Sequence, residues 1–377
     1  MNVDVAVAGA GFAGLACARA AAARGLRTVV LERKSDPGAA PHTTGLLVQE
    51  VAEEFDFPRR LTREIRGVRL YAPSLRSIDL VSPGYCFWAT DTPQVLRWLA
   101  SRAESSGARI LPGTPCSGAV RAGGRILVDP PGVRARHLVG ADGARSAVAR
   151  AVGLGRNRRL LLGTEVHCEG VRGVDPGFLH CFLDSALAPG YLGWVVPGLG
   201  VTQVGLGCHS AHRPDLPAFV RRLRRRFDFG RARVVGRRGG VIPVGGRVRP
   251  FATPNVMLLG DAAGLVSPLT AGGIHTAMRY GHLAGHALAD HLLRGAPDPA
   301  RVLAARFPRF RWKRLLRRVI DLRPPNGLYD VLLPSPGFRA LASTVFFHHR
   351  GLLSRSAWRD VADAWATREP RRRLAAK

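Results

Sequence analysis

Three glycines near the start of the chain, with an acidic residue after them, have the spacing needed to hold a nucleotide cofactor. Gly9, Gly11 and Gly14 separate a β-branched run from an Ala-rich stretch, and Glu32 ends the next apolar run. Glycines at this spacing permit a tight turn, close approach of a pyrophosphate to the backbone, and tight packing of a helix on a strand. The positive end of that helix faces the phosphates, and Glu32 can accept hydrogen bonds from ribose hydroxyls. The pattern predicts a dinucleotide site and favours FAD or NAD over NADP.

Two distant segments place a carboxylate after an apolar run. Asp142 with Gly143 follows one run, and Gly260 with Asp261 follows another, ahead of a helix expected at about residues 275–293. Together with the glycine loop, these segments resemble the three FAD-binding signatures of p-hydroxybenzoate-hydroxylase-type flavoproteins. Three ordered motifs are far more specific than a single one.

The resemblance implies that residues from all three segments hold FAD. Asp261 would bind ribityl or ribose hydroxyls, and Gly272–Ile274 would direct backbone NH groups at the pyrimidine edge of the flavin, where the helix dipole stabilises negative charge. Asp142 would lie near the cofactor or, alternatively, cap its strand end, and the backbone at Val120 would contact adenine. The residues so assigned to FAD are Gly9, Gly11, Phe12, Ala13, Gly14, Glu32, Arg33, Thr44, Val120, Asp142, Gly260, Asp261, Gly272, Gly273 and Ile274.

Some positions depart from the pattern of these flavoproteins. Thr44 replaces the basic residue of a strand that passes over the flavin, so an electrostatic role there is lost. Asp91 and Thr92 stand where many relatives carry Arg or Gln. His42 is either a proton donor near the ring or an ordinary hydrogen-bonded surface histidine.

The segment 189–197 in the middle of the chain, followed by the run 203–207, is similar to the Tyr-x-Trp-x-x-Pro pattern of geranylgeranyl-reductase-like proteins. The segment 260–269 also resembles that branch. The resemblance implies that Tyr191, Trp194 and Pro268 line a substrate pocket, with ordinary sheet packing as the alternative for the two aromatic residues. The cysteine-containing motif of the branch is not visible in this chain.

Two chemistries on an apolar or aromatic small molecule remain open. A flavin enzyme of this kind either oxygenates its substrate through a peroxyflavin, or reduces or oxidises a carbon–carbon bond. The first would suit a monooxygenase or halogenase-type tailoring enzyme of natural-product biosynthesis. No second GxGxxG appears, so the reductant is expected to be transiently bound NAD(P)H or a partner electron carrier. No residue stands out as a catalytic acid or base.

The composition is that of a globular protein, with 46% hydrophobic residues, and its net charge is +29. The C-terminal region is basic and interleaves arginines with aromatic residues between positions 306 and 314. Three interpretations stay open for it: helices that cap the substrate domain, a peripheral membrane contact, or a nucleic-acid surface, the last being the remote alternative of a non-catalytic basic protein. Six scattered cysteines favour a cytoplasmic setting and no metal site.

The expected fold class is α/β, with a Rossmann-like FAD-binding domain, a mixed-sheet substrate domain and C-terminal helices. The ranges are 1–75, 100–157 and 251–295 for the discontinuous FAD-binding domain, 76–99 and 158–250 for the substrate-binding domain, and 296–377 for the basic helical region.

Overall fold

Strand, helix and strand follow one another at the N-terminus, as the glycine pattern predicts. In the computed structural model, which describes residues 1–129 and 132–347, β1 (Asn2–Ala8) leads into α1 (Phe12–Ala22) and β2 (Thr28–Leu31) runs parallel to β1. A Cβ on Gly14 would lie 1.9 Å from the Gly9 carbonyl oxygen. Only glycine therefore lets the first turn of α1 pack on the loop that precedes it.

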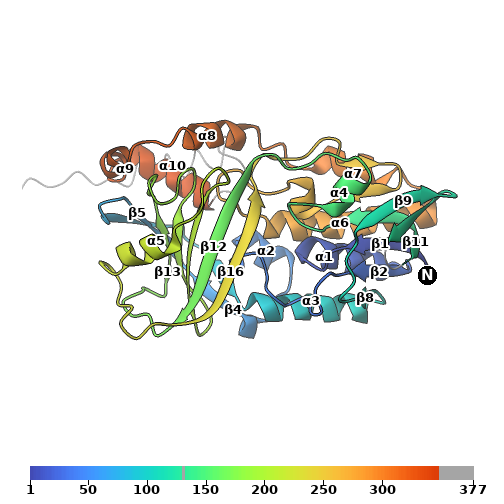
Figure 1. Cartoon of the computed structure of the whole chain (residues 1–377), viewed down its shortest axis with the longest axis horizontal. Helices are drawn as coiled ribbons and strands as arrows, with labels where there is room; N and C mark the ends of the chain where they lie inside the picture. Colours follow the sequence, from blue (N-terminus) through green and yellow to red (C-terminus); the bar gives the residue numbers. More distant parts are fainter. Residues whose placement is uncertain (130–131, 348–377) are drawn as a thin grey trace, which may run out of the picture.

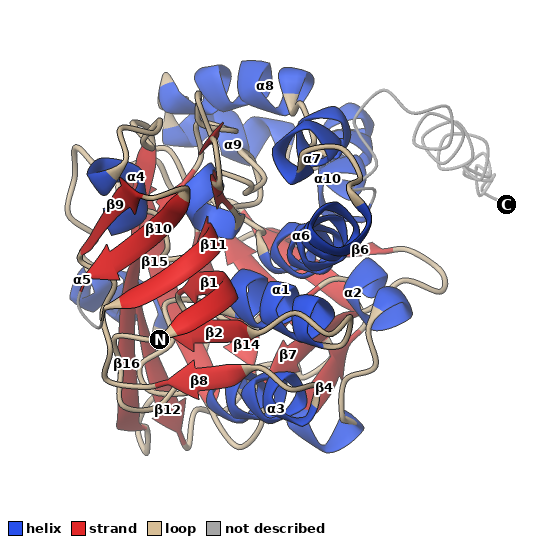
Figure 2. Ribbon diagram, turned by 90° about the vertical axis from the view of Figure 1, so that its right-hand side faces the viewer, coloured by secondary structure: helices blue, strands red, loops and turns tan. Residues whose placement is uncertain are grey.

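The first sheet has eight strands in the order β17-β18-β11-β1-β2-β8, with β9 and β10 attached beside β11. The central pairs are parallel. Helices α1, α3 and α6 lie on one face of this sheet (Figure 2). A Cβ on Gly281 of α6 would lie 2.4 Å from the Ala13 carbonyl oxygen, so α6 crosses α1 at close range. The further elements here are β8 (Arg109–Leu111), β9 (Gly118–Ala122), β10 (Arg125–Asp129), β11 (Val133–Gly140), β17 (Ala252–Thr253), β18 (Val256–Leu258), α3 (Thr92–Ser105), α4 (Ala147–Ala151) and α6 (Ile274–Arg294).

The second sheet has seven strands in the order β16-β12-β15-β14-β13-β5-β6 and is mixed, because β13 runs parallel to β5 while its other pairs are antiparallel. Helix α5 (Leu216–Leu223) packs on its outer face, where Phe219 meets Phe182 edge-on. The strands are β5 (Gly67–Tyr71), β6 (Ser77–Val81), β12 (Leu160–Glu169), β13 (Phe178–Phe182), β14 (Gly193–Pro197), β15 (Thr202–His209) and β16 (Arg233–Pro243).

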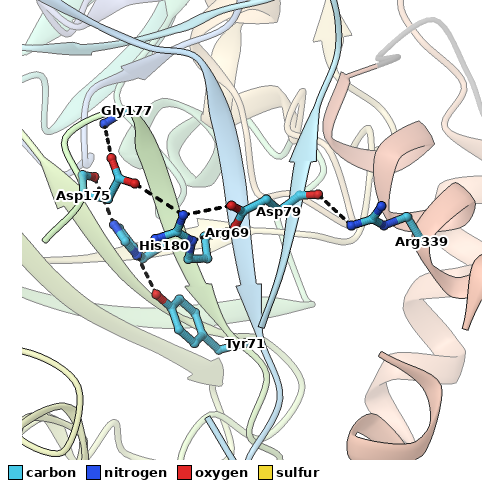
Figure 3. A network of polar contacts seen from close by, with 7 residues as sticks. All are labelled: Arg69, Tyr71, Asp79, Asp175, Gly177, His180 and Arg339. Atoms are coloured by element: carbon cyan, nitrogen blue, oxygen red, sulfur yellow. Dashed lines mark hydrogen bonds and ion pairs between the residues drawn. The ribbon is translucent and has the colours of Figure 1, made fainter. Parts of the chain in front are cut away.

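A polar network ties the edge of the second sheet to the C-terminal helices (Figure 3). Arg69 donates two hydrogen bonds to the Asp79 carboxylate, at 2.6 and 2.8 Å. The Tyr71 hydroxyl lies 2.9 Å from His180 Nδ1, and Arg339 of α10 donates to the Asp79 carbonyl oxygen. None of these side chains lines the large cavity described below, so the network has a structural role.

Short elements and the C-terminal helices complete the described chain. A third, small sheet has three strands in the order β3-β7-β4. Its strands β3 and β4 precede β5 in the chain, and β7 follows β6. Helices α8, α9 and α10 lie along the top of the second-sheet half of the molecule (Figure 1). No described helix combines the length and apolarity needed to cross a bilayer. These elements are β3 (Leu46–Leu47), β4 (Thr62–Ile65), β7 (Phe87–Thr90), α2 (Gln49–Glu54), η1 (Arg59–Leu61), η2 (Gly260–Ala263), α7 (Pro299–Arg306), α8 (Arg311–Asp321), α9 (Asn326–Leu332) and α10 (Pro336–Phe347).

The predicted α/β class is confirmed, and the structure differs from the expected domain ranges at two segments. β5 belongs to the second sheet, although 1–75 was assigned to the FAD-binding domain, because it pairs along its length with β13. α3 belongs to the first half, although 76–99 was assigned to the substrate domain, because Leu96 and Leu99 pack in the core beneath α1. The part of the basic region at 348–377 lies outside the described residues.

Candidate functional site

A cavity of about 850 Å³ reaches from the glycine loop, past the inner face of the second sheet, to the C-terminal helices. Its walls come from segments at both ends of the chain and from its middle. Gly11 lies at one end, Trp194 faces its central part, and Phe346 lies on the helical side. The three predicted FAD segments and the predicted aromatic pair therefore share one cavity.

The glycine loop presents free backbone donors to this cavity. Helix α1 begins after Gly11, and no side chain of residues 1–129 and 132–347 caps its first turn. A Cβ on Gly11 would meet nothing within 4 Å, which leaves room for a ligand against the backbone. The Glu32 carboxylate is held beside the loop, since it accepts from the Ala10 NH at 2.7 Å and from the Lys34 NH at 3.0 Å.

The two carboxylate oxygens of Asp142 differ in their hydrogen bonding. Oδ2 accepts from the NH groups of Ala147 and Val148, at 2.6 and 3.0 Å, and so caps α4. Oδ1 is buried and has no partner within residues 1–129 and 132–347, although Asp142 lines the cavity. Buried polar atoms are almost always hydrogen-bonded, so Oδ1 is suited to a donor on a bound molecule. Oδ2 thus has a structural capping role, and contact between Oδ1 and the cofactor stays a prediction.

The third segment adds a carboxylate and a helix N-terminus. Asp261 lines the cavity, no described side chain or backbone group donates to its carboxylate, and burial raises its pKa to about 6. Helix α6 begins at Ile274 without a side-chain cap, and Gly272 and Gly273 line the cavity just before it. The uncapped NH groups carry the positive end of the helix dipole, which favours a negatively charged ligand edge.

Asn157 joins the second and third segments and was not predicted from the sequence. Its Nδ2 donates to the carbonyl oxygens of Ala144, at 3.0 Å, and of Asp261, at 2.8 Å. It therefore fixes the distance between the loops that carry Asp142 and Asp261. Asn157 belongs to no motif, so the sequence gives no signal that its amide joins the two loops.

The remaining FAD predictions fall into two groups. Phe12, Ala13, Arg33, Thr44 and Gly260 line the cavity. Gly14 is buried behind the glycine loop, and Val120 on β9 does not line the cavity and is 59% exposed. Val120 therefore lies outside the cavity lining, and the predicted contact of its backbone with adenine stays a prediction.

Tyr191 and Trp194 both face the cavity, while Pro268 is buried and does not line it. Trp194 Nε1 donates to Glu165 Oε2 at 2.7 Å, across the strand between them. Gly205 of β15 lies between them, since it pairs with Glu165 of β12 on one side and with Trp194 of β14 on the other. A Cβ on Gly205 would lie 2.1 Å from the Trp194 indole. Glycine in β15 therefore lets the Trp194 ring cross β15 and reach the carboxylate.

Several polar or ionisable residues of the cavity were missed by sequence reasoning, among them Glu165, Arg238 and Cys181 in its sheet wall. Glu165 is buried and also pairs with His167 Nε2 at 2.8 Å. Arg238 of β16 donates to the Thr43 carbonyl oxygen at 3.1 Å, and burial lowers its pKa. Cys181 of β13 lines the cavity, and burial raises the pKa of its thiol.

His42, for which two interpretations were open, is hydrogen-bonded. Its Nδ1 lies 2.8 Å from the Gly239 carbonyl oxygen, and its Nε2 lies 3.1 Å from the Arg33 guanidinium. The ring also lines the cavity. Both nitrogens are thus occupied within the protein.

The helical side of the cavity is mostly apolar, with Arg317 and Tyr329 as its polar members, and was not anticipated as a cavity wall. Leu179 and Leu192 of the sheet half meet side chains of α8, α9 and α10 there. The C-terminal contributors include Leu316, Ile320, Leu332, Phe338, Ala342 and Phe346. The arrangement suits a dinucleotide at the glycine end and an elongated apolar molecule between sheet and helices.

The residues present fit FAD. An open glycine loop and an uncapped helix suit the pyrophosphate. Glu32, the free Oδ1 of Asp142 and the Asp261 carboxylate are acceptors for hydroxyl groups, and the start of α6 suits the electron-rich edge of a flavin. Within the described residues, no cluster of His, Cys, Asp and Glu is arranged to hold a metal ion.

Comparisons with known proteins agree with this donor set. Residues 4–82 match the model of a family described as FAD dependent oxidoreductase, and residues 77–307 match the FAD binding domain. A digeranylgeranylglycerophospholipid reductase of Methanothrix thermoacetophila is 32% identical, over 78% of this chain and 80% of its own. A menaquinone reductase of Mycobacterium tuberculosis is 32% identical, over 82% and 85%. A geranylgeranyl bacteriochlorophyll reductase-like protein of Thermoplasma acidophilum has a similar fold, with a TM-score of 0.80, 24% identity and coverage of 97% and 96%.

Proposed function

This chain belongs to the geranylgeranyl-reductase-like branch of the FAD-dependent oxidoreductases, and we propose that it reduces carbon–carbon double bonds in a prenyl-chain lipid. FAD held by the three segments at the glycine end would be the redox cofactor. The substrate would lie with its prenyl chain between the second sheet and helices α8–α10.

One observation carries the choice of substrate: the cavity continues from the FAD end into a wall built almost wholly of apolar side chains. A prenyl chain has no hydrogen-bonding groups, and this wall presents none to it at Leu179, Leu192, Leu316, Phe338 and Phe346. Each methylene removed from water there contributes about 0.8 kcal/mol. A small polar aromatic substrate would leave most of this wall in contact with water.

When bound and reduced, the flavin would supply a hydride to one carbon of the double bond, and a proton from water would complete the other carbon. The protein's own part is binding, orientation and exclusion of water. Asp261 and Asp142 Oδ1 accept hydrogen bonds from the cofactor, and the NH groups at the start of α6 face its electron-rich edge. Trp194, anchored by Glu165, and Tyr191, anchored through the loop before α6, present aromatic faces to the substrate.

The proposal includes a reductant that binds only transiently. No second GxGxxG accompanies the glycine loop, so NAD(P)H or a partner electron carrier would deliver the electrons. The cytoplasmic setting expected from the cysteines, with a membrane contact, suits a lipid substrate.

The test is a single turnover without oxygen. The purified holoenzyme is reduced anaerobically and mixed with a detergent-dispersed prenyl lipid, and both the flavin spectrum and the product mass are followed. We expect flavin reoxidation together with a product that gains two hydrogen atoms per reduced double bond. A reduced enzyme that ignores prenyl lipids, but adds oxygen to an olefinic or aromatic compound in air, would place the chemistry with the monooxygenases.

A further inference from the structure

Helix α8 exposes large apolar side chains on its outer side although two of its cations are buried. Lys313 and Arg317 are buried, whereas Trp312 and Leu315 are exposed. Arg317 Nη1 is buried without a partner in the described part of the chain, and its Nη2 donates to the Gly190 carbonyl oxygen. The inner face of α8 is therefore held by specific polar contacts, and the outward apolar face is a fixed feature of the fold.

The outward apolar residues form one stripe. Trp312, Leu315, Val319 and Leu322 are spaced by three, four and three positions, which places them on the same side of a helix. Leu322 is 81% exposed. Val331 of α9 is 72% exposed and lies three positions after Leu328, so both are on one side of α9. A concentration of exposed large apolar side chains on consecutive helices marks a surface that contacts another apolar phase.

The cavity opens on this surface. Val319, Leu328 and Leu341, from α8, α9 and α10, line the cavity and are also between 42% and 51% exposed. They are thus the rim of an opening that joins the apolar wall of the cavity to the apolar outer face. All three rim residues are apolar, so an apolar molecule that passes between them meets no polar group of their side chains.

A row of arginines flanks the apolar stripe. Arg311, Arg314 and Arg318 are exposed, and no ion pair involves them within the described residues. Their spacing of three and four places them in a parallel row beside the stripe. An apolar face flanked by unpaired cations is the pattern of helices that lie in the headgroup region of a membrane with anionic lipids.

We propose that α8–α10 form a membrane-docking face, defined by Trp312, Leu322, Val331 and the arginine row of α8, which seats the cavity opening against an anionic bilayer. The lipid substrate then enters through the rim directly from the bilayer. The entry role rests on the proposed function, whereas the docking does not. Charge complementarity and the opening favour a bilayer over a second copy of this chain.

The test uses the full-length holoenzyme and vesicles of phosphatidylcholine, with and without phosphatidylglycerol. We expect binding to the anionic vesicles, weakened at high salt. The variant W312S/L322S/V331S, in which none of the altered residues lines the cavity, should lower the vesicle partition coefficient by at least about tenfold. The variant R311Q/R314Q/R318Q should lose the preference for phosphatidylglycerol. The control V234S/L293S, which alters exposed apolar residues on β16 and α6, should bind as the wild type does.

Two further measurements separate the outcomes. Turnover of a detergent-dispersed prenyl lipid should be the same in W312S/L322S/V331S and in the wild type. If neither protein turns over the prenyl lipid, the proposed function is contradicted, but the docking proposal is not affected. A wild type that ignores anionic vesicles overturns the docking proposal. A wild-type dimer that the triple serine variant breaks, seen by sedimentation, would instead identify the face as a contact between copies.

Discussion

The Tyr191 hydroxyl donates a hydrogen bond of 2.8 Å to the Thr270 carbonyl oxygen. Tyr191 comes from the segment before β14, and Thr270 lies in the loop that leads into α6. The bond therefore couples the substrate wall to the backbone proposed to face the flavin. Burial raises the pKa of Tyr191, so the hydroxyl stays protonated and able to donate.

Removing this bond should loosen the loop without unfolding the protein. We expect Tyr191→Phe to weaken FAD binding about fivefold, as the loss of a hydrogen bond worth about 1 kcal/mol predicts. Fluorescence titration of the cofactor-free protein with FAD measures the change. Phe338→Leu, on the helical wall, is the matched control, and an equal loss in that variant would contradict the coupling.

Asp261 predicts a pH dependence of cofactor binding. Its pKa is raised to about 6 by burial, and hydroxyl donors bind the ionised carboxylate. Protonation therefore competes with FAD, and the dissociation constant should rise as the pH falls below about 6, approaching about tenfold per pH unit. Asp261→Asn should abolish this dependence and weaken binding at neutral pH by about thirtyfold, the loss expected for hydrogen bonds to a charged group. A variant that keeps the wild-type pH profile would show that another group titrates.

Gly205 should be required for the Trp194–Glu165 contact. A Cβ at this position overlaps the indole, so Gly205→Ala must displace a ring that has little room to move, at a cost of about 1–3 kcal/mol. Urea unfolding and the near-ultraviolet circular dichroism of Trp194 report the two effects. Gly118→Ala on β9 is the control, because its new Cβ would have only ordinary contacts at 3.9 Å. Equal stabilities in the two variants would contradict the prediction.

His180 should make the protein less stable in mild acid. Burial lowers its pKa from 6.5 to about 4, so between these values the unfolded chain binds a proton that the folded chain does not. The free energy of unfolding therefore falls as the pH decreases from 6.5 towards 4, by up to about 3 kcal/mol. In His180→Gln the slope of stability against pH should be shallower than in the wild type, whereas Phe338→Leu, which alters no titratable group, should keep the wild-type slope. Urea unfolding at several pH values provides the comparison.

The parts of the site that the sequence predicted are those whose partners are close in the chain. The turn at Gly9, the start of α1 and the start of α6 depend on neighbours within a few residues, so spacing alone locates them. Glu165 escaped prediction because it meets Trp194 only through the register of three strands. The apolar residues of α8–α10 looked like ordinary amphipathic faces, and only the packed helices show that they wall a cavity.

Both the first-sheet half and the second-sheet half of the molecule are built from separate segments of the chain. β5 and β6 enter the second sheet before α3 and β8 to β11 build the first, β12 to β16 return to the second, and β18 and α6 complete the first. Each half therefore has an incomplete core until distant stretches of sequence have joined it. Neither half can be cut out as a continuous piece of sequence. A single cut in the chain therefore leaves no fragment that contains one complete half, and the parts proposed to bind cofactor and lipid cannot be separated by truncation.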